Sequence, residues 1–335
     1  MSLSFRPYLT ISLLFCPLIF GAFSCQSGQN NPQQSQKTNQ ASITAPVAVP
    51  EFDAAGAYQL IQDQVNFGPR IPGSPAQKAC ADWLERRLGP YCDSVYRQNV
   101  TVTAGNGKSL PCMNIIGVIR PEAPHRILLL AHWDSRPWAD QDKTGKDKPI
   151  LGADDGGSGT AVLISISKVL KEHPLPEGWG VDILLADVED YGKSEWGDDS
   201  YALGTQYWAH HPHMAGYKAQ AGILLDMVGA RNARFPLEAY SQQHAGNVQQ
   251  DVWQAAAKAG YSSYFVYENG GQITDDHVPV NEILKIPTID IINLPAGSMT
   301  GFGSYWHTHQ DNMDIIDQNT LKAVGQTLLQ YLYTR

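Results

Sequence analysis

Apolar positions recur along the chain with the two periods that distinguish helices from strands. Helical spacing of apolar residues predicts helices over residues 53–66, 75–88, 159–171, 203–210, 247–259 and 318–333. Short apolar or alternating runs predict strands over residues 94–102, 113–119, 127–131, 181–186, 222–225, 264–266 and 286–292. Because strands alternate with helices, we expect an α/β fold in which helices flank a mixed, mostly parallel central β-sheet.

Two segments interrupt this alternation. Residues 68–74 read Gly-Pro-Arg-Ile-Pro-Gly-Ser and predict a turn between the first two helices. Residues 140–149 are rich in charge, and we expect a solvated loop there. No internal repeat is visible in the sequence, and residues 51–335 are predicted to form a single catalytic domain.

The first 50 residues have a different composition. An apolar stretch from Leu9 to Phe23 follows Arg6, and its length indicates a secretory signal over residues 1–25 rather than a membrane span. The signal ends in Gly-Ala-Phe-Ser-Cys, which resembles a bacterial lipobox and predicts lipid attachment at Cys25. An ordinary signal with an incidental cysteine is the alternative. Residues 26–50 are rich in Gln, Asn, Ser, Ala and Pro, and we expect a disordered tether.

These features predict an exported protein of the bacterial periplasm or outer membrane, which meets the membrane only through its lipid. The chain has 335 residues, of which 43% are hydrophobic, and its formal net charge is −9. Such a charge argues against nucleic acid or an anionic membrane surface as a partner, and we expect a monomer. Cys80, Cys92 and Cys112 would permit one disulfide after export, and the sequence leaves their pairing open.

Candidate chemistry comes from five short acidic or histidine-bearing patches, four of which directly follow an apolar run. They are His132-Trp133-Asp134, Gly152-Ala153-Asp154-Asp155-Gly156, Glu189-Asp190, Leu225-Asp226-Met227 and Trp306-His307-Thr308. Side chains at the carboxyl ends of parallel strands converge on one crevice. A ring of Asp, Glu and His in such a crevice is what a zinc ion requires.

Each patch also has an ordinary interpretation. Asp155 would cap the helix that follows it, Glu189 and Asp190 would lie in a solvated loop, and His307 would be a core histidine. Their common placement at strand ends favours a shared site instead. We predict that Asp155, Asp190 and His307 bind one Zn²⁺ and leave a fourth position open, as in catalytic zinc sites. Glu189 is the predicted general acid/base.

The motifs resemble those of the zinc-dependent aminopeptidase superfamily, and finer features are similar to the glutaminyl-peptide cyclotransferases (glutaminyl cyclases). The superfamily motifs are Gly68-Pro69-Arg70, Pro72-Gly73-Ser74, His132-x-Asp134-Ser135, Gly152-Ala153-x-Asp155, Glu189-Asp190, Asp226 and His307. The cyclase features are Asp226-Met227-Val228-Gly229-Ala230, Phe235-Pro236, Asp275-Asp276-His277-Val278-Pro279 and Trp306-His307-Thr308. The resemblance covers roughly residues 55–333.

The resemblance implies the same zinc ligands, with Glu189 as acid/base, and adds further site residues. Asp226 and Asp275 match two acidic residues that form a hydrogen-bonded relay beside Glu189 in the family. Trp196 and Trp306 match aromatic residues of the substrate pocket, and Phe302 is a further candidate. Two departures stand out: animal members have Glu where this chain has Asp190, and Ala131 replaces a cysteine of their disulfide, which excludes that disulfide here.

The implied reaction is cyclisation of an amino-terminal Gln in peptides and proteins to pyroglutamate, with release of ammonia. A zinc aminopeptidase is the alternative, because His132, Asp226 and the shared Asp155 would hold a second zinc that activates water. His132 and Asp134 are then a possible remnant of that second metal site. Bulky residues near the site favour cyclisation, because they would shrink the pocket to one small side chain; they are Trp133, Trp138, Trp196 and Trp306.

A non-catalytic binding module that kept the fold is the third possibility. The intact Glu189 and the complete set of three ligands argue against it.

Overall fold

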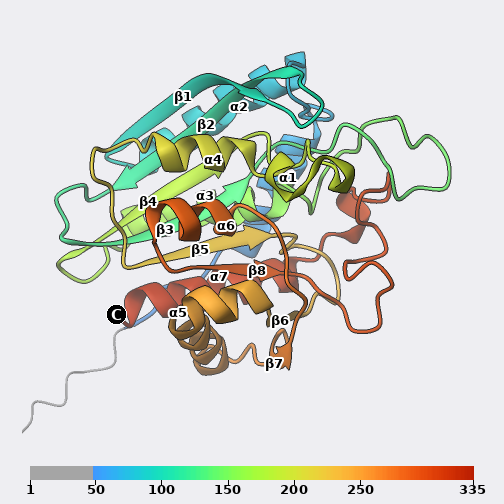
Figure 1. Ribbon diagram of the computed structural model, residues 1–335. Coiled ribbons are helices and arrows are strands. Elements are labelled where there is room, and N and C mark those ends of the chain that lie inside the picture. The colour runs from blue at the N-terminus through green and yellow to red at the C-terminus, as the bar shows by residue number, and fades with distance from the viewer. Residues whose placement is uncertain (1–47) are drawn as a thin grey trace, which may run out of the picture. The chain divides into compact units, whose positions relative to one another are not determined.

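The computed structural model describes residues 48–335 (Figure 1). The predicted secretory signal and the predicted lipid attachment at Cys25 lie outside the described residues. The same holds for residues 26–47 of the predicted tether. The described residues fall within one compact unit. Among the helices of this part of the chain, none has the length and apolar character needed to cross a bilayer.

A six-stranded sheet with strand order β1-β2-β4-β3-β5-β8 forms the centre of the fold. Its strands are β1 (Ser94–Thr103), β2 (Ser109–Ile119), β3 (His125–His132), β4 (Trp179–Ala186), β5 (Ala221–Asp226) and β8 (Thr288–Ile292). The four strands β4, β3, β5 and β8 run parallel, whereas β1 and β2 form an antiparallel hairpin at one edge. This confirms the predicted mixed, mostly parallel sheet.

Helices cover both faces of the sheet. They are α1 (Ala54–Val65), α2 (Pro75–Leu88), α3 (Gly157–Glu172), α4 (Leu203–His210), α5 (Ala239–Lys258), α6 (His277–Pro279) and α7 (Gln318–Tyr333). Short helical turns are Gly89–Tyr91, Ser194–Trp196, Asp198–Ser200 and Met313–Ile315, and a π-helical turn, Val280–Leu284, follows α6. In Figure 1, α4 and α6 lie in front of the sheet and α3 and α7 lie behind it.

Alternation along the strands divides the core into two layers. On β3, Ile127 and Leu129 pack in the layer that contains α1, α3 and α7, whereas Leu128 and Leu130 pack against Trp208 of α4. Successive side chains of a strand point to opposite faces, and here both faces are buried. Each buried Leu contributes about 1.5–3 kcal/mol relative to an exposed one. The two layers hold the strand ends rigidly in place.

Two elements differ from the sequence prediction. Helix α5 begins at Ala239 rather than at residue 247, because the Glu238 carboxylate accepts hydrogen bonds from the amides of Tyr240 and Ser241. The backbone of Ala245 is non-helical inside α5, which breaks the apolar period there. The predicted strand 264–266 becomes β7 (Phe265–Asn269), which pairs with the short β6 (Phe235–Leu237) outside the central sheet.

The three cysteines of the described chain are structural. Cys80, Cys92 and Cys112 are buried and free, so the disulfide that three thiols would permit is not formed among them. Burial raises the pKa of the Cys80 and Cys92 thiols to about 12. Thiols held in the neutral form are poor nucleophiles and poor metal ligands.

Candidate active site

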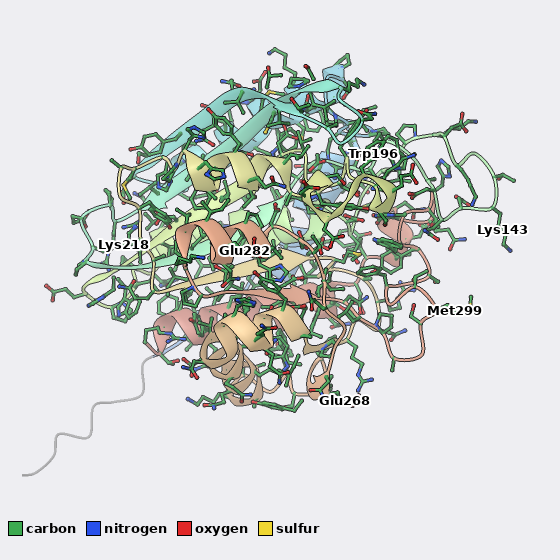
Figure 2. All side chains as sticks on the ribbon, viewed as in Figure 1. Lys143, Trp196, Lys218, Glu268, Glu282 and Met299 are labelled. Carbon is green, nitrogen blue, oxygen red and sulfur yellow. The ribbon has the colours of Figure 1, made fainter. Side chains whose placement is uncertain are left out.

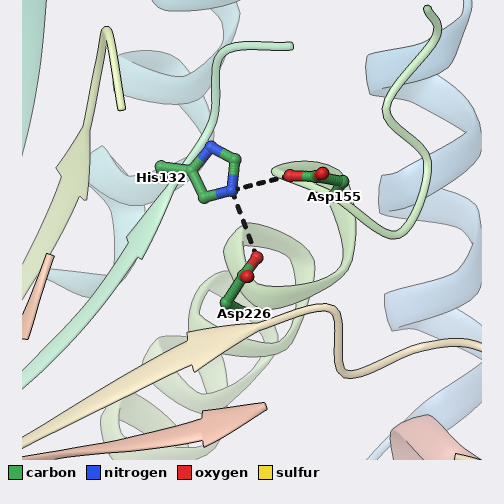
Figure 3. Close-up of side chains that lie close together, drawn as sticks. All are labelled: His132, Asp155 and Asp226. Atoms are coloured by element: carbon green, nitrogen blue, oxygen red, sulfur yellow. Dashed lines mark hydrogen bonds and ion pairs between the residues drawn. The ribbon is translucent and has the colours of Figure 1, made fainter. Parts of the chain in front are cut away.

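The polar side chains predicted at the strand ends converge at the carboxyl edge of the sheet. His132 is the last residue of β3, and Asp226 is the last residue of β5. Glu189 and Asp190 follow the end of β4, and Asp155 lies in the loop before α3. Figure 3 shows Asp155 and Asp226 approaching one ring nitrogen of His132 from two different segments.

Within residues 48–335, Asp155, Asp190 and His307 form one of two clusters of groups that fit a metal ion. His307 Nε2 lies 3.4 Å from Asp190 Oδ1 and 3.8 Å from Asp155 Oδ2. Tetrahedral zinc with bonds of about 2.0–2.1 Å places neighbouring ligand atoms about 3.3 Å apart, so little movement is needed. Asp190 Oδ2 is buried and has no hydrogen-bond partner within the described residues, which leaves it free to bind a metal.

Two residues that sequence reasoning missed hold these ligands from behind. Arg136 Nη1 donates to Asp190 Oδ1 at 2.7 Å, and Arg136 Nε and Nη2 donate to the Asp140 carboxylate at 3.0 and 2.7 Å. Asp140 Oδ1 lies 3.3 Å from His307 Nδ1. A carboxylate on the outer ring nitrogen fixes the tautomer and orientation of a metal-binding histidine. The prediction of a solvated loop over residues 140–149 is therefore wrong for its first residue, because the Asp140 side chain folds inward to Arg136 and His307.

Neighbouring charges keep these carboxylates in the metal-binding form. Burial would raise the pKa of Asp190, but the Arg136 charge and His307 hold it below the ordinary value. Burial would likewise raise the pKa of Asp140, and hydrogen bonds from His307 and Arg136 hold it below the ordinary value. Because metal ligands bind in the deprotonated form, the lowered pKa of Asp190 favours a bound cation, whereas the charge of Asp140 faces His307 from its outer side.

The loop that carries Asp155 is fixed by residues far along the chain. The Asp311 carboxylate accepts hydrogen bonds from the amides of Asp154 and Asp155 at 2.8 and 3.2 Å. Gly156 has a φ of +88°, and a Cβ there would collide with the carbonyl oxygen of Asp134. The Gly-rich loop thus needs glycine at this position to bring Asp155 up to the crevice.

His132, Asp155 and Asp226 form the other cluster, which shares Asp155. His132 Nε2 lies 3.1 Å from Asp155 Oδ1 and 3.2 Å from Asp226 Oδ1, and His132 Nδ1 lies 3.4 Å from Asp134 Oδ1. Burial alone would lower the pKa of His132, but its carboxylate partners raise it well above the ordinary value. Both ring nitrogens therefore already face carboxylates.

Asp134, predicted with His132 as a remnant of a second metal site, lies outside both clusters. Its Oδ1 accepts a hydrogen bond from the amide of Glu189 at 3.1 Å, and its Oδ2 accepts one from the amide of Asp190 at 3.2 Å. Asp134 thus holds the backbone of the acidic pair and orients His132.

Glu189 is 8% exposed, and the described residues offer its carboxylate no hydrogen-bond partner. Burial raises its pKa well above the ordinary value, and the negative charge of Asp275 raises it further. The relay that the resemblance implied is not hydrogen-bonded here: Asp226 pairs with His132, and Asp275 Oδ1 accepts from the amide of Asp276 at 2.5 Å. Two carboxylates bond directly only when they share a proton, because two negative charges repel.

Strained backbone marks the same segments. Val188, Met227 and His307 have φ of +58°, +48° and +53°, in the left-handed region that non-glycine residues rarely adopt. Each adjoins or is a site residue, and such strain of about 1–3 kcal/mol persists only where surrounding contacts enforce it. The strained backbone at these positions therefore lowers the stability of the fold while it orients the side chains of the site.

The predicted pocket aromatics fall into two groups. Trp306 stacks on His307 with ring centroids 3.6 Å apart, and Phe302 stacks on Trp306 at 4.4 Å. Trp196, labelled in Figure 2, instead packs edge-on against Trp138 at 6.0 Å. Trp133 is fully buried in the main core, so the expectation that it narrows the pocket is wrong.

Three comparisons place these features among known proteins. The model of peptidase family M28 matches residues 114–332. The crystal structure of Porphyromonas gingivalis glutaminyl cyclase is 50% identical, covers 84% of this chain and 98% of its own, and gives a TM-score of 0.82.

A Zn-dependent exopeptidase from Parabacteroides distasonis is 47% identical, covers 86% of this chain and 100% of its own, and gives a TM-score of 0.83. The glutaminyl-peptide cyclotransferase of Gloydius blomhoffii is 24% identical over an alignment of 296 residues. The match covers 78% of this chain and 77% of that protein.

Proposed function

The chain belongs to peptidase family M28, and we propose that within this family it is a glutaminyl cyclase. It would convert the N-terminal Gln of peptides and proteins to pyroglutamate and release ammonia. The observation that carries this choice over hydrolysis is the aromatic wall at the metal ligands, where Phe302, Trp306 and His307 stack in succession. The likeness to glutaminyl cyclases supports it.

One Zn²⁺ per chain would be held by Asp155, Asp190 and His307. When bound, it would supply a Lewis acid for the γ-amide carbonyl group of the substrate. The unpaired Oδ2 of Asp190 and the distances of His307 from the two carboxylates support this assignment.

Glu189 would carry the proton of the reaction. The α-amine of the N-terminal Gln attacks its own γ-carbonyl carbon, the bond from that carbon to the amide nitrogen breaks, and ammonia leaves. The Glu189 carboxylate accepts the proton that the amine loses and delivers it to the departing nitrogen. Because Glu189 is buried and unpaired in the described part of the chain, its oxygens are available to the substrate.

The aromatic wall would position the reacting groups. An amine and an amide of the same residue react quickly only when the side chain is folded back, and a tight pocket can hold that conformation. The ring edges of this stack and the outer face of Phe302 would suit the apolar methylene groups of a folded Gln side chain. No activated water takes part in this reaction.

An aminopeptidase with two metals is the second candidate, because His132, Asp155 and Asp226 also lie within metal-binding distance of one another. We consider it the weaker candidate, since the aromatic side chains beside His307 suit a folded Gln side chain.

From the sequence pattern alone we also propose that the protein is an exported monomer. It would lie in the bacterial periplasm or at the outer membrane, anchored through a lipid on Cys25.

The deciding experiment measures ammonia release and pyroglutamate formation from Gln-initiated peptides by the purified domain. Formation of pyroglutamyl peptide and ammonia in equal amounts supports the proposal. Release of free amino acids from aminoacyl amides, without cyclisation, would replace it with the aminopeptidase.

A further inference from the structure

A cleft of about 360 Å³ opens beside the catalytic centre. Its walls come from Asp198–Gln206, at the start of α4, and from Gln272–Ile283, around α6. The volume lies in the range of about 300–1,000 Å³ that ligand pockets occupy.

Two contacts connect this cleft to the catalytic residues. Asp275 lines the cleft and is only 4% exposed. Among the described residues, its carboxylate accepts a hydrogen bond through Oδ1 from the amide of Asp276. On the other wall, the amide of Ala202 donates to the carbonyl of Glu189 at 3.1 Å. The cleft therefore begins at the groups that would surround the reacting Gln.

The rim of the cleft is acidic. Asp198, Asp199 and Glu282 line it and are exposed, and none of them forms an ion pair with another described residue. Glu282, labelled in Figure 2, comes from the π-helical turn after α6 and accepts a hydrogen bond from the Tyr240 hydroxyl at 3.3 Å. No Lys or Arg of the described chain lines the cleft.

We propose that this cleft binds the residues that follow the N-terminal Gln and selects substrates with Lys or Arg at the second or third position. The peptide chain must leave the catalytic centre from the Gln carbonyl, and an extended residue spans about 3.3 Å, so the next side chains reach the cleft. A long cationic side chain would meet three carboxylates that have no ion-pair partner among the described residues, whereas an acidic residue there would be repelled. The inference rests on the proposed cyclase function.

The test compares kcat/KM for Gln-Lys, Gln-Ala and Gln-Glu peptides of equal length. For the wild-type chain at low salt, we expect about a tenfold preference for Gln-Lys over Gln-Glu, the size that a few exposed charge pairs give. The preference should shrink at high salt because exposed charges are screened. The triple variant Asp198→Asn/Asp199→Asn/Glu282→Gln should keep the wild-type rate on Gln-Ala and lose the preference.

A matched control removes the same charge elsewhere. The variant Glu122→Gln/Glu172→Gln/Glu177→Gln changes three exposed carboxylates near the amino ends of β3 and β4, and it should keep the preference. Equal rates on the three peptides for the wild type, or an unchanged preference in the cleft variant, would overturn the inference while cyclisation of Gln-Ala persists. Failure to cyclise any of the peptides would overturn the cyclase proposal and this inference together.

Discussion

The two clusters that share Asp155 have similar ligands but different surroundings. In the cluster with Asp190 and His307, each of these ligands has a partner on its outer side, and one carboxylate oxygen is buried with no partner among the described residues. In the cluster with His132 and Asp226, Asp134 likewise lies at the outer nitrogen of His132, but no carboxylate oxygen is buried without a partner among the described residues. Ligand types alone do not distinguish a metal site from a hydrogen-bonded set; the atoms left unpaired do.

The clusters also differ in how they are built. His132 and Asp226 are the terminal residues of adjacent strands, so the sheet places them directly. Asp190 and His307 lie in loops, and Asp134 and Asp140 hold those loops in position. A loop site needs such braces because loops are otherwise the more mobile part of a fold.

Removing one histidine from each cluster tests the comparison most directly. We expect His307→Asn to lose both zinc and cyclisation, because the remaining two carboxylates hold zinc poorly. His132→Asn should keep close to one zinc per chain. Metal content after dialysis, measured by mass spectrometry on variants whose circular dichroism matches the wild type, gives the answer. Two zinc ions in the wild type, with one lost in each variant, would establish the two-metal aminopeptidase arrangement instead.

Glu189→Gln separates proton transfer from metal binding. The amide is close in size to the carboxylate but cannot accept the proton of the attacking amine, so we expect kcat to fall by about 10²–10⁴-fold, the usual contribution of a general acid/base. Zinc content should stay at the wild-type level, because Glu189 belongs to neither cluster. A variant that cyclises Gln peptides at the wild-type rate would show that another group carries the proton.

The sequence pattern was enough to find the candidate metal ligands and the acid/base, but not the residues that hold those ligands from behind. Apolar runs ending in polar residues were enough to find His132 and Asp226, since parallel strands share one carboxyl edge. Arg136 and Asp140 gave no such signal, because the sequence does not show whether a charged side chain in a loop points into solvent or folds inward. Trp133 was misjudged for a related reason: a strand-end position does not show whether a side chain faces the crevice or the core.

The smallest effect among these site variants concerns Asp140, which faces the outer nitrogen of His307. Asp140→Asn removes the charge opposite His307 Nδ1 and leaves the side chain nearly the same size. Loss of such an outer partner typically weakens metal binding about 10–100-fold. We expect a loss of zinc affinity in this range when the variant competes with a chromogenic chelator for zinc. The kcat measured at saturating zinc should change less. Asp142→Asn is the matched control, because Asp142 lies in the same loop but binds the exposed His309 at 2.7 Å. Equal zinc affinity in both variants would mean that Asp140 only holds the loop, and the contrast between the two clusters would then rest on Arg136 and the unpaired Asp190 oxygen.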